Sequence, residues 1–144
     1  MRPMNNQYTG AIQKINFDSA VENLQLVEKL IDQVCEEYNV NQDYYGNILI
    51  ALTEAVNNAI LHGNKSVREK KIVVSFEPHS KDLLFTVEDQ GDGFDYDSLP
   101  DPTDPQNIDK PSGRGVFLMK HLADDVKFHN EGRKVELTFK LSAN

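Results

Sequence analysis

Three short segments of the sequence combine polar side chains with glycines in patterns that suit ligand chemistry. The first, Glu54 to Gly63, holds Glu54 and Asn58, which share one face if the segment is helical. A carboxylate there can accept a proton or orient a nucleophile, and the amide oxygen of asparagine is a hard ligand suited to Mg²⁺. The same pair is also typical of an ordinary solvated helix face.

The second segment, Asp89 to Phe94, reads DQGDGF and directly follows an expected strand. The carboxylate of Asp89 can accept a hydrogen bond from an exocyclic amine such as that of adenine. Gly91 and Gly93 permit close approach of the backbone or positive φ angles. An ordinary Asp–Gly turn and a Ca²⁺ loop are the alternatives, although the spacing lacks the EF-hand pattern.

The third segment, Ser112 to Lys120, places Gly113 and Gly115 before an expected helix. Free N–H groups at a helix N-terminus, with the positive end of the helix dipole behind them, form a phosphate site. Arg114 adds positive charge there. A glycine-containing helix cap is the alternative, and the segment is neither a Walker A motif nor a dinucleotide fingerprint.

Together and in this order, the segments resemble the boxes of the GHKL (Bergerat-fold) ATPases. EAVNNAILHG over residues 54–63 is similar to their N-box, DQGDGF over 89–94 to their G1 box, and GRGVFLM over 113–119 to their G2 box. The best match is to the anti-sigma factor serine/threonine kinases of bacterial partner-switching systems. The resemblance extends from about residue 12 to residue 141.

The resemblance implies a role for each matching residue. Asn58 would coordinate the Mg²⁺ that bridges the phosphates of ATP, Glu54 would activate the attacking hydroxyl, and Asp89 would bind the adenine amine. The other implied ATP contacts lie in the G1 and G2 boxes or on the last strand, where a threonine assists adenine binding through water: Gly91, Gly93, Phe94, Gly113, Gly115, Val116 and Thr138.

One position departs from the kinase pattern. Pro111 stands two residues before Gly113, where the best-matching kinases often carry an arginine, and Arg114 is expected to supply the catalytic charge instead. The resemblance implies an ATP- and Mg²⁺-dependent kinase, acting as a homodimer, that phosphorylates a serine or threonine of a STAS-type antagonist and binds a sigma factor. The alternative is a non-catalytic, nucleotide-gated binding module in which ATP orders residues 95–112.

Length and charge narrow the classes of function. The 144 residues fit a single domain over 1–144. The net charge of −8 disfavours direct nucleic-acid binding, because an acidic surface repels phosphates. No apolar run approaches the ~18 residues of a membrane span, so a cytoplasmic protein without a membrane partner is expected.

The apolar spacing predicts the elements that must position these segments. Ser19 and Glu22 suggest a capping box at the start of a helix, and Asn41 is expected to cap a second helix that ends at Gly63. The complete order is a strand at 9–17, a helix that follows Ser19 and extends to about Tyr38, and a helix from Asn41 to Gly63. Next come a strand at 72–77, a strand that begins at Leu83, and a loop at 90–113 with a lid at 95–112. A helix at about 114–123, a strand that begins at Val126 and a final strand at 135–141 complete the chain. This order predicts an α+β two-layer sandwich, with a mixed, mostly antiparallel sheet covered on one face by helices.

Overall fold

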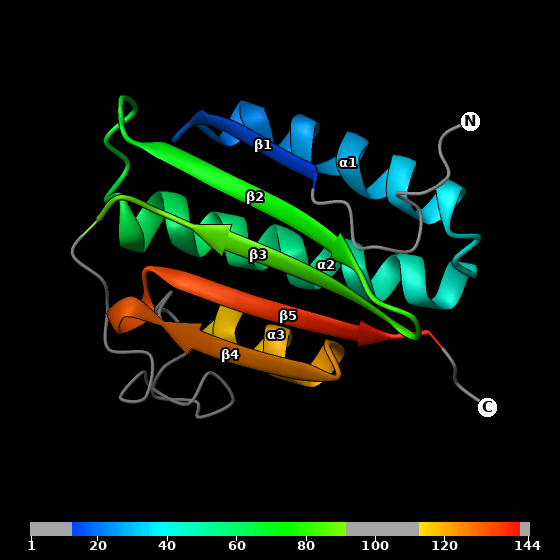
Figure 1. The fold of residues 1–144 in the computed structure, drawn as a ribbon. Helices are drawn as coiled ribbons and strands as arrows, with labels where there is room; N and C mark the ends of the chain where they lie inside the picture. The colour runs from blue at the N-terminus through cyan, green and yellow to red at the C-terminus, as the bar shows by residue number, and fades with distance from the viewer. Residues whose placement is uncertain (1–12, 92–112, 142–144) are drawn as a thin grey trace.

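One antiparallel sheet forms the centre of the computed structural model, which describes residues 13–91 and 113–141. Within these ranges the strand order is β1-β2-β3-β5-β4, and every strand runs antiparallel to its neighbours (Figure 1). The strands are β1 (Gln13–Asp18), β2 (Lys71–Pro78), β3 (Asp82–Glu88), β4 (Asp125–His129) and β5 (Lys134–Lys140). The predicted hairpins are β2–β3 and β4–β5.

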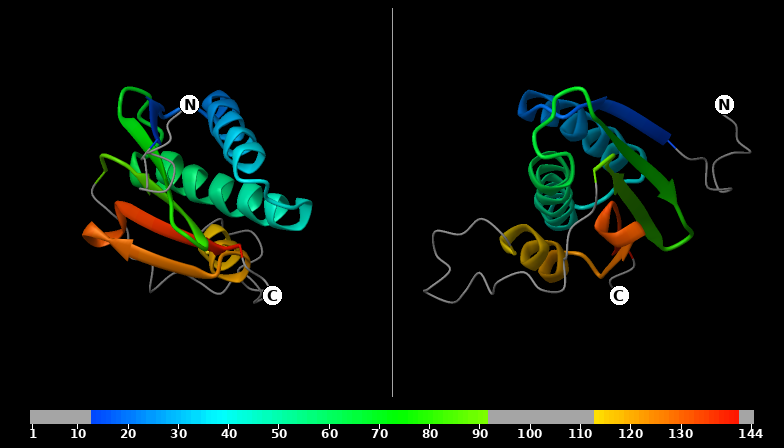
Figure 2. Two further views of the ribbon diagram at one scale, coloured as in Figure 1. Left: turned by 45° about the vertical axis from the view of Figure 1, so that its right-hand side comes forward. Right: turned by 90° about the vertical axis from the view of Figure 1, so that its left-hand side faces the viewer.

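Three helices cover one face of this sheet, as the two side views in Figure 2 show. They are α1 (Leu24–Glu37), α2 (Gln42–Asn58) and α3 (Arg114–Leu122). A π-helical turn over Ala59–Gly63 prolongs α2, so the predicted second helix does extend to Gly63. The arrangement confirms the predicted α+β two-layer sandwich with helices on one face. The expected mixed sheet is not found in the described residues, because all four strand pairs there are antiparallel.

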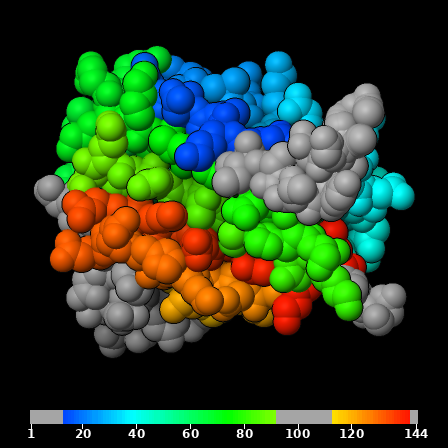
Figure 3. Space-filling view, viewed as in Figure 1, coloured from blue at the N-terminus to red at the C-terminus, as the bar shows by residue number. Residues whose placement is uncertain are grey.

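The hydrophobic core lies between the sheet and the helices. Successive side chains of a strand point to opposite faces, so alternate residues of β2, β3 and β5 are buried. The Phe85 ring packs between two others across these strands: it is tilted against Phe76, with centroids 5.2 Å apart, and edge-to-face with Phe139, with centroids 6.1 Å apart. The other face of the sheet carries partly exposed side chains such as Thr86 and Glu136, and Figure 3 views the molecule from that side.

The two helix starts differ in how well the sequence predicted them. Asn41 caps α2 as expected, because its side chain accepts a hydrogen bond from the Tyr44 N–H at 3.1 Å. The capping box at Ser19 and Glu22 is wrong. Ser19 donates instead to the carbonyl of Lys70 at 2.6 Å, and Glu22 pairs with Arg68 at 2.9 Å. A 3₁₀ turn over Val21–Asn23 precedes α1 in place of a capped helical start.

Two further expectations concern the lid and a membrane span. The lid expected over 95–112 lies outside the described residues. Across residues 13–91 and 113–141, no helix is both long and apolar enough to cross a membrane.

Candidate functional site

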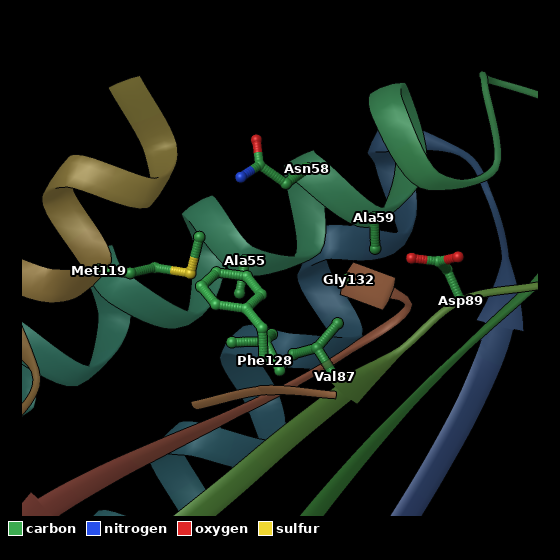
Figure 4. A pocket seen from close by; sticks show the side chains of 9 residues that line it. Ala55, Asn58, Ala59, Val87, Asp89, Met119, Phe128 and Gly132 are labelled. Carbon is green, nitrogen blue, oxygen red and sulfur yellow. The ribbon is translucent and has the colours of Figure 1, made fainter. Parts of the chain in front are cut away.

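A pocket opens between α2, α3 and the inner face of the sheet (Figure 4). Its walls are mostly apolar, with one carboxylate and one amide among them. Such a composition suits a flat, largely apolar ligand that makes a few directed polar contacts. The lining residues are Ala55, Asn58, Ala59, Val87, Asp89, Met119, Phe128, Gly132 and Val135.

Asp89 lies at the end of β3, at one end of this pocket (Figure 4). It is only 8% exposed, and its Oδ1 accepts a hydrogen bond from the N–H of Gly91 at 2.8 Å. Burial raises the pKa of the Asp89 carboxyl, and the Gly91 hydrogen bond and the charge of Arg133 oppose that rise only in part. A buried carboxylate of this kind is suited to accept a hydrogen bond from a ligand.

Close backbone approach fixes the surroundings of Asp89. Gly63, at the end of the α2 extension, lies so near that a Cβ on it would overlap the Asp89 carboxylate. A Cβ on Gly91 would in turn overlap the carbonyl of Gly63. Both positions therefore require glycine, and the last turn of the helix packs directly against the end of β3.

Glu54 and Asn58 lie one helical turn apart on α2, and both are partly exposed. Asn58 lines the pocket, as Figure 4 shows. Gly115 of α3 faces both side chains: a Cβ on Gly115 would lie 3.0 Å from Asn58 Oδ1 and 3.1 Å from Glu54 Oε1. The first and third segments of the sequence therefore meet in space, at the edge of the same pocket.

The expected site residues at the start of α3 differ from one another in exposure. Gly113 precedes the helix with a φ of 90°, in the left-handed region that favours glycine. Arg114 is exposed at the first position of the helix, and Val116 is 5% exposed within the hydrophobic core. Their assignments as catalytic and ATP-contacting residues stay predictions. Gly93 and Phe94 lie outside the described residues.

The expectation for Thr138 does not hold. Along β5, Val135, Leu137 and Phe139 point toward the helices, so the side chain of Thr138 points to the other face. There it borders a shallow depression with Leu84 and Glu136. The sheet thus separates Thr138 from the pocket, and the inward position on this strand that lines the pocket is Val135.

Sequence reasoning also missed most of the apolar lining. Ala55 lies three residues before Asn58 and four before Ala59, so helical spacing from Asn58 could have assigned Ala55 to the site. Phe128 and Val135 come from the two strands farthest along the chain, and only the sheet order brings them to α2. Single apolar residues within strands form no motif that a sequence could reveal.

Comparisons with known proteins identify the family of this chain. Residues 17–139 match the family described as histidine kinase-like ATPase domain. A serine-protein kinase RsbW from Staphylococcus epidermidis is 28% identical over 125 residues, which cover 82% of this chain and 79% of that protein. The RsbW of Staphylococcus aureus strain MRSA252 shows the same identity and coverage.

A solved structure shares the fold. It contains the RsbU and RsbW domains of Rv1364c from Mycobacterium tuberculosis, and it superimposes with a TM-score of 0.61 at 16% sequence identity. The match covers 91% of this chain and 32% of that longer chain. The profile match over 17–139, the shared fold and the pocket beside α2 together show that this chain belongs to the family of histidine kinase-like ATPase domains.

Proposed function

We propose that this chain binds ATP with Mg²⁺ and transfers the terminal phosphoryl group to a serine or threonine of a STAS-type antagonist protein. It would also bind a sigma factor and act as a homodimer. The family match supports ATP use, and the similarity to proteins named serine-protein kinase RsbW supports the kinase role. The anti-sigma role rests on the resemblance of the three sequence segments to the anti-sigma factor kinases. One structural observation carries the proposal: Asp89 and Asn58 line one mostly apolar pocket, and Glu54 lies one helical turn from Asn58.

Adenine is expected to bind at the Asp89 end of the pocket, whose walls would have to move apart, because the cavity volume is only about 10 Å³. The apolar side chains of Val87, Met119 and Phe128 would contact the faces of the base, and the Asp89 carboxylate would accept a hydrogen bond from its exocyclic amine. Oδ1 of Asp89 already accepts a hydrogen bond from the N–H of Gly91. Oδ2 is the carboxylate oxygen closest to where a Cβ on Gly63 would lie. Burial strengthens such a hydrogen bond because little water competes for the carboxylate.

Mg²⁺ and the phosphates are expected to bind at the other end, beside Asn58. Magnesium commonly takes one or two protein ligands together with phosphate oxygens and waters, so the amide oxygen of Asn58 suffices as a protein ligand. The absence of a side chain on Gly115 lets the backbone of α3 approach Asn58 and Glu54 closely. When bound, Mg²⁺ would neutralise negative charge on the phosphates and so favour in-line transfer of the terminal phosphoryl group.

Glu54 would act as the general base. The hydroxyl of the substrate serine or threonine would lose its proton to the Glu54 carboxylate as its oxygen attacks the terminal phosphorus. The bond between that phosphorus and the bridging oxygen breaks, and ADP leaves. Glu54 lies one turn from Asn58 and beside Gly115, so the base and the expected metal ligand are adjacent.

Phosphoryl transfer from radiolabelled Mg-ATP to the cognate antagonist tests this function. Wild type should label the antagonist, and Glu54→Gln should reduce the rate by about 10²- to 10⁴-fold, the usual contribution of a general base. Glu54→Gln should still bind ATP. If wild type binds ATP yet transfers no phosphate, the kinase claim is rejected in favour of a nucleotide-gated binding module.

A further inference from the structure

A fully buried asparagine lies behind the pocket and has no role in the function proposed so far. Asn64 follows the last turn of the α2 extension and is 0% exposed. Its Nδ2 donates to Ser19 Oγ at 2.7 Å and to the carbonyl of Lys71 at 3.1 Å. Its Oδ1 accepts from the N–H of Gln90 at 2.8 Å. A buried amide bonded at both ends fixes its neighbours, because breaking either contact leaves a polar group unsatisfied.

The contact to Gln90 bears directly on Asp89. The N–H of Gln90 belongs to the peptide unit that joins it to Asp89, so Asn64 fixes the orientation of that unit. The pairing of β3 with β5 ends one residue earlier, at Glu88. Asp89 is held on its other side, where its N–H donates to the carbonyl of Arg133 at 2.9 Å.

Asn64 is also tied to the helix that forms the opposite wall of the pocket. Its backbone N–H donates to the carbonyl of Ala59 at 2.7 Å. Ala59 lines the pocket and follows Asn58 directly. One side chain and one backbone N–H of the same residue therefore connect the helix that carries Asn58 to the strand end that carries Asp89.

We propose that Asn64 is a positioning residue that sets the purine selectivity of this site. It holds the Asp89 carboxylate where it accepts from the exocyclic amine of adenine and opposes the carbonyl oxygen that guanine has in the same place. Without Asn64, the carboxylate can turn toward the ring N–H of guanine, so discrimination weakens. This inference rests on the proposed ATP binding.

Titration calorimetry of Mg-ATP and Mg-GTP with wild type, Asn64→Ala and Ser19→Ala tests the inference. Ser19→Ala is the matched control, because it removes a partner of Asn64 in the same buried network and leaves the Gln90 contact intact. In Asn64→Ala, the ATP dissociation constant should rise about tenfold, and the preference for ATP over GTP should fall by a similar factor. Ser19→Ala should lose stability and keep the wild-type preference.

Three results would overturn the inference. If Asn64→Ala keeps the wild-type preference for ATP over GTP, Asn64 does not position Asp89. If Ser19→Ala loses as much of that preference as Asn64→Ala, the hydrogen-bond network has only a structural role. Wild type that binds no ATP rejects the proposed function and this inference with it, so the two failures are distinguishable.

A milder variant and a second readout cover a failure of Asn64→Ala to fold. Asn64→Ser has a side chain too short for the Gln90 contact, and it leaves space for a water beside Ser19. It should show the same loss of preference. In the nucleotide-free protein, amide exchange at Gly91, whose N–H is bonded to Asp89 Oδ1, should accelerate in Asn64→Ser and not in Ser19→Ala. Unchanged exchange and preference in Asn64→Ser would contradict the proposal.

Discussion

The two ends of the pocket are built in different ways. At the Asp89 end, the carboxylate is 8% exposed, two glycine backbones are in contact, and a buried asparagine fixes the neighbouring peptide. At the other end, Glu54 and Asn58 are partly exposed side chains on one helix face beside Gly115. The first end is suited to selecting a base, and the second to charged groups that must move during a reaction. Substitutions at the Asp89 end should therefore reduce ATP affinity and stability, whereas substitutions at the other end should mainly slow phosphoryl transfer.

Among the glycine substitutions that compare the two ends, Gly63→Ala should have the largest effect. The new Cβ would overlap the Asp89 carboxylate and push it from its place. ATP affinity should fall by about 100-fold, since a hydrogen bond to a charged group contributes up to about 3 kcal/mol. Overpacking should also reduce the free energy of unfolding by about 1–3 kcal/mol. Calorimetric titration and urea denaturation measure the two quantities.

Gly46→Ala is the matched control for that substitution. Gly46 lies within α2 with no atom within 4 Å of where its Cβ would be. Alanine there should raise the free energy of unfolding by about 0.5–1 kcal/mol and leave ATP affinity unchanged. If both variants bound ATP like wild type, the close approach of Gly63 to Asp89 would have no functional meaning.

Gly115→Ala probes the other end, with a smaller expected effect. Its Cβ would lie 3.0–3.1 Å from the side-chain atoms of Asn58 and Glu54, which can shift because both are partly exposed. Phosphoryl transfer should slow by about tenfold through misplacement of the base and the metal ligand, with little change in stability. Single-turnover transfer assays and thermal unfolding measure this. A loss of stability as large as that of Gly63→Ala would erase the contrast between the two ends.

The ionisation of Asp89 should make the stability of the protein depend on pH. Burial raises its pKa above the usual 3.8, so the folded state holds this proton more tightly than the unfolded chain. Ionised Asp89 therefore opposes folding, and the cost appears as the pH rises above 3.8 through the raised pKa and persists at neutral pH. Nucleotide-free Asp89→Asn should be more stable than wild type at neutral pH, and the difference should shrink on acidification. Urea denaturation across this pH range checks the sign. A less stable variant at neutral pH would contradict it.

The smallest effect is expected at Thr138. Its side chain lies on the face of the sheet opposite the pocket, so Thr138→Val should change ATP affinity less than about twofold, within the usual range of a distant surface substitution. Val135, on the inner face of the same strand, provides the comparison: Val135→Ala should weaken binding because it lines the pocket. A large loss in Thr138→Val alone would reverse this assignment of faces.

The sequence predicted the elements better than it predicted the site. Helix period and strand alternation gave the sandwich, and Asn41 gave the start of α2. The Thr138 error came from matching a motif without following strand parity, although the apolar Val135, Leu137 and Phe139 already marked the inner face. The alternation of apolar residues along this strand was therefore enough to place Thr138 on the outer face.

Other features were beyond sequence reasoning. Ser19 has the residue type and spacing of a helix cap, yet long-range contacts to Asn64 and Lys70 claim its hydroxyl. The role of Asn64 depends on partners 26 and 45 residues away, and no local pattern encodes such contacts. Local rules fail here because tertiary hydrogen bonds compete for the same polar groups.

Calorimetric titration of Mg-ATP into wild type and Asp89→Asn tests the central claim most directly. Wild type should bind with saturable, one-to-one stoichiometry, because one pocket borders Asp89 and Asn58. Asp89→Asn should remain folded and lose most of that binding, since the amide is a weaker acceptor for the adenine amine. Absence of ATP binding by folded wild type, or equal binding by both proteins, would contradict the account.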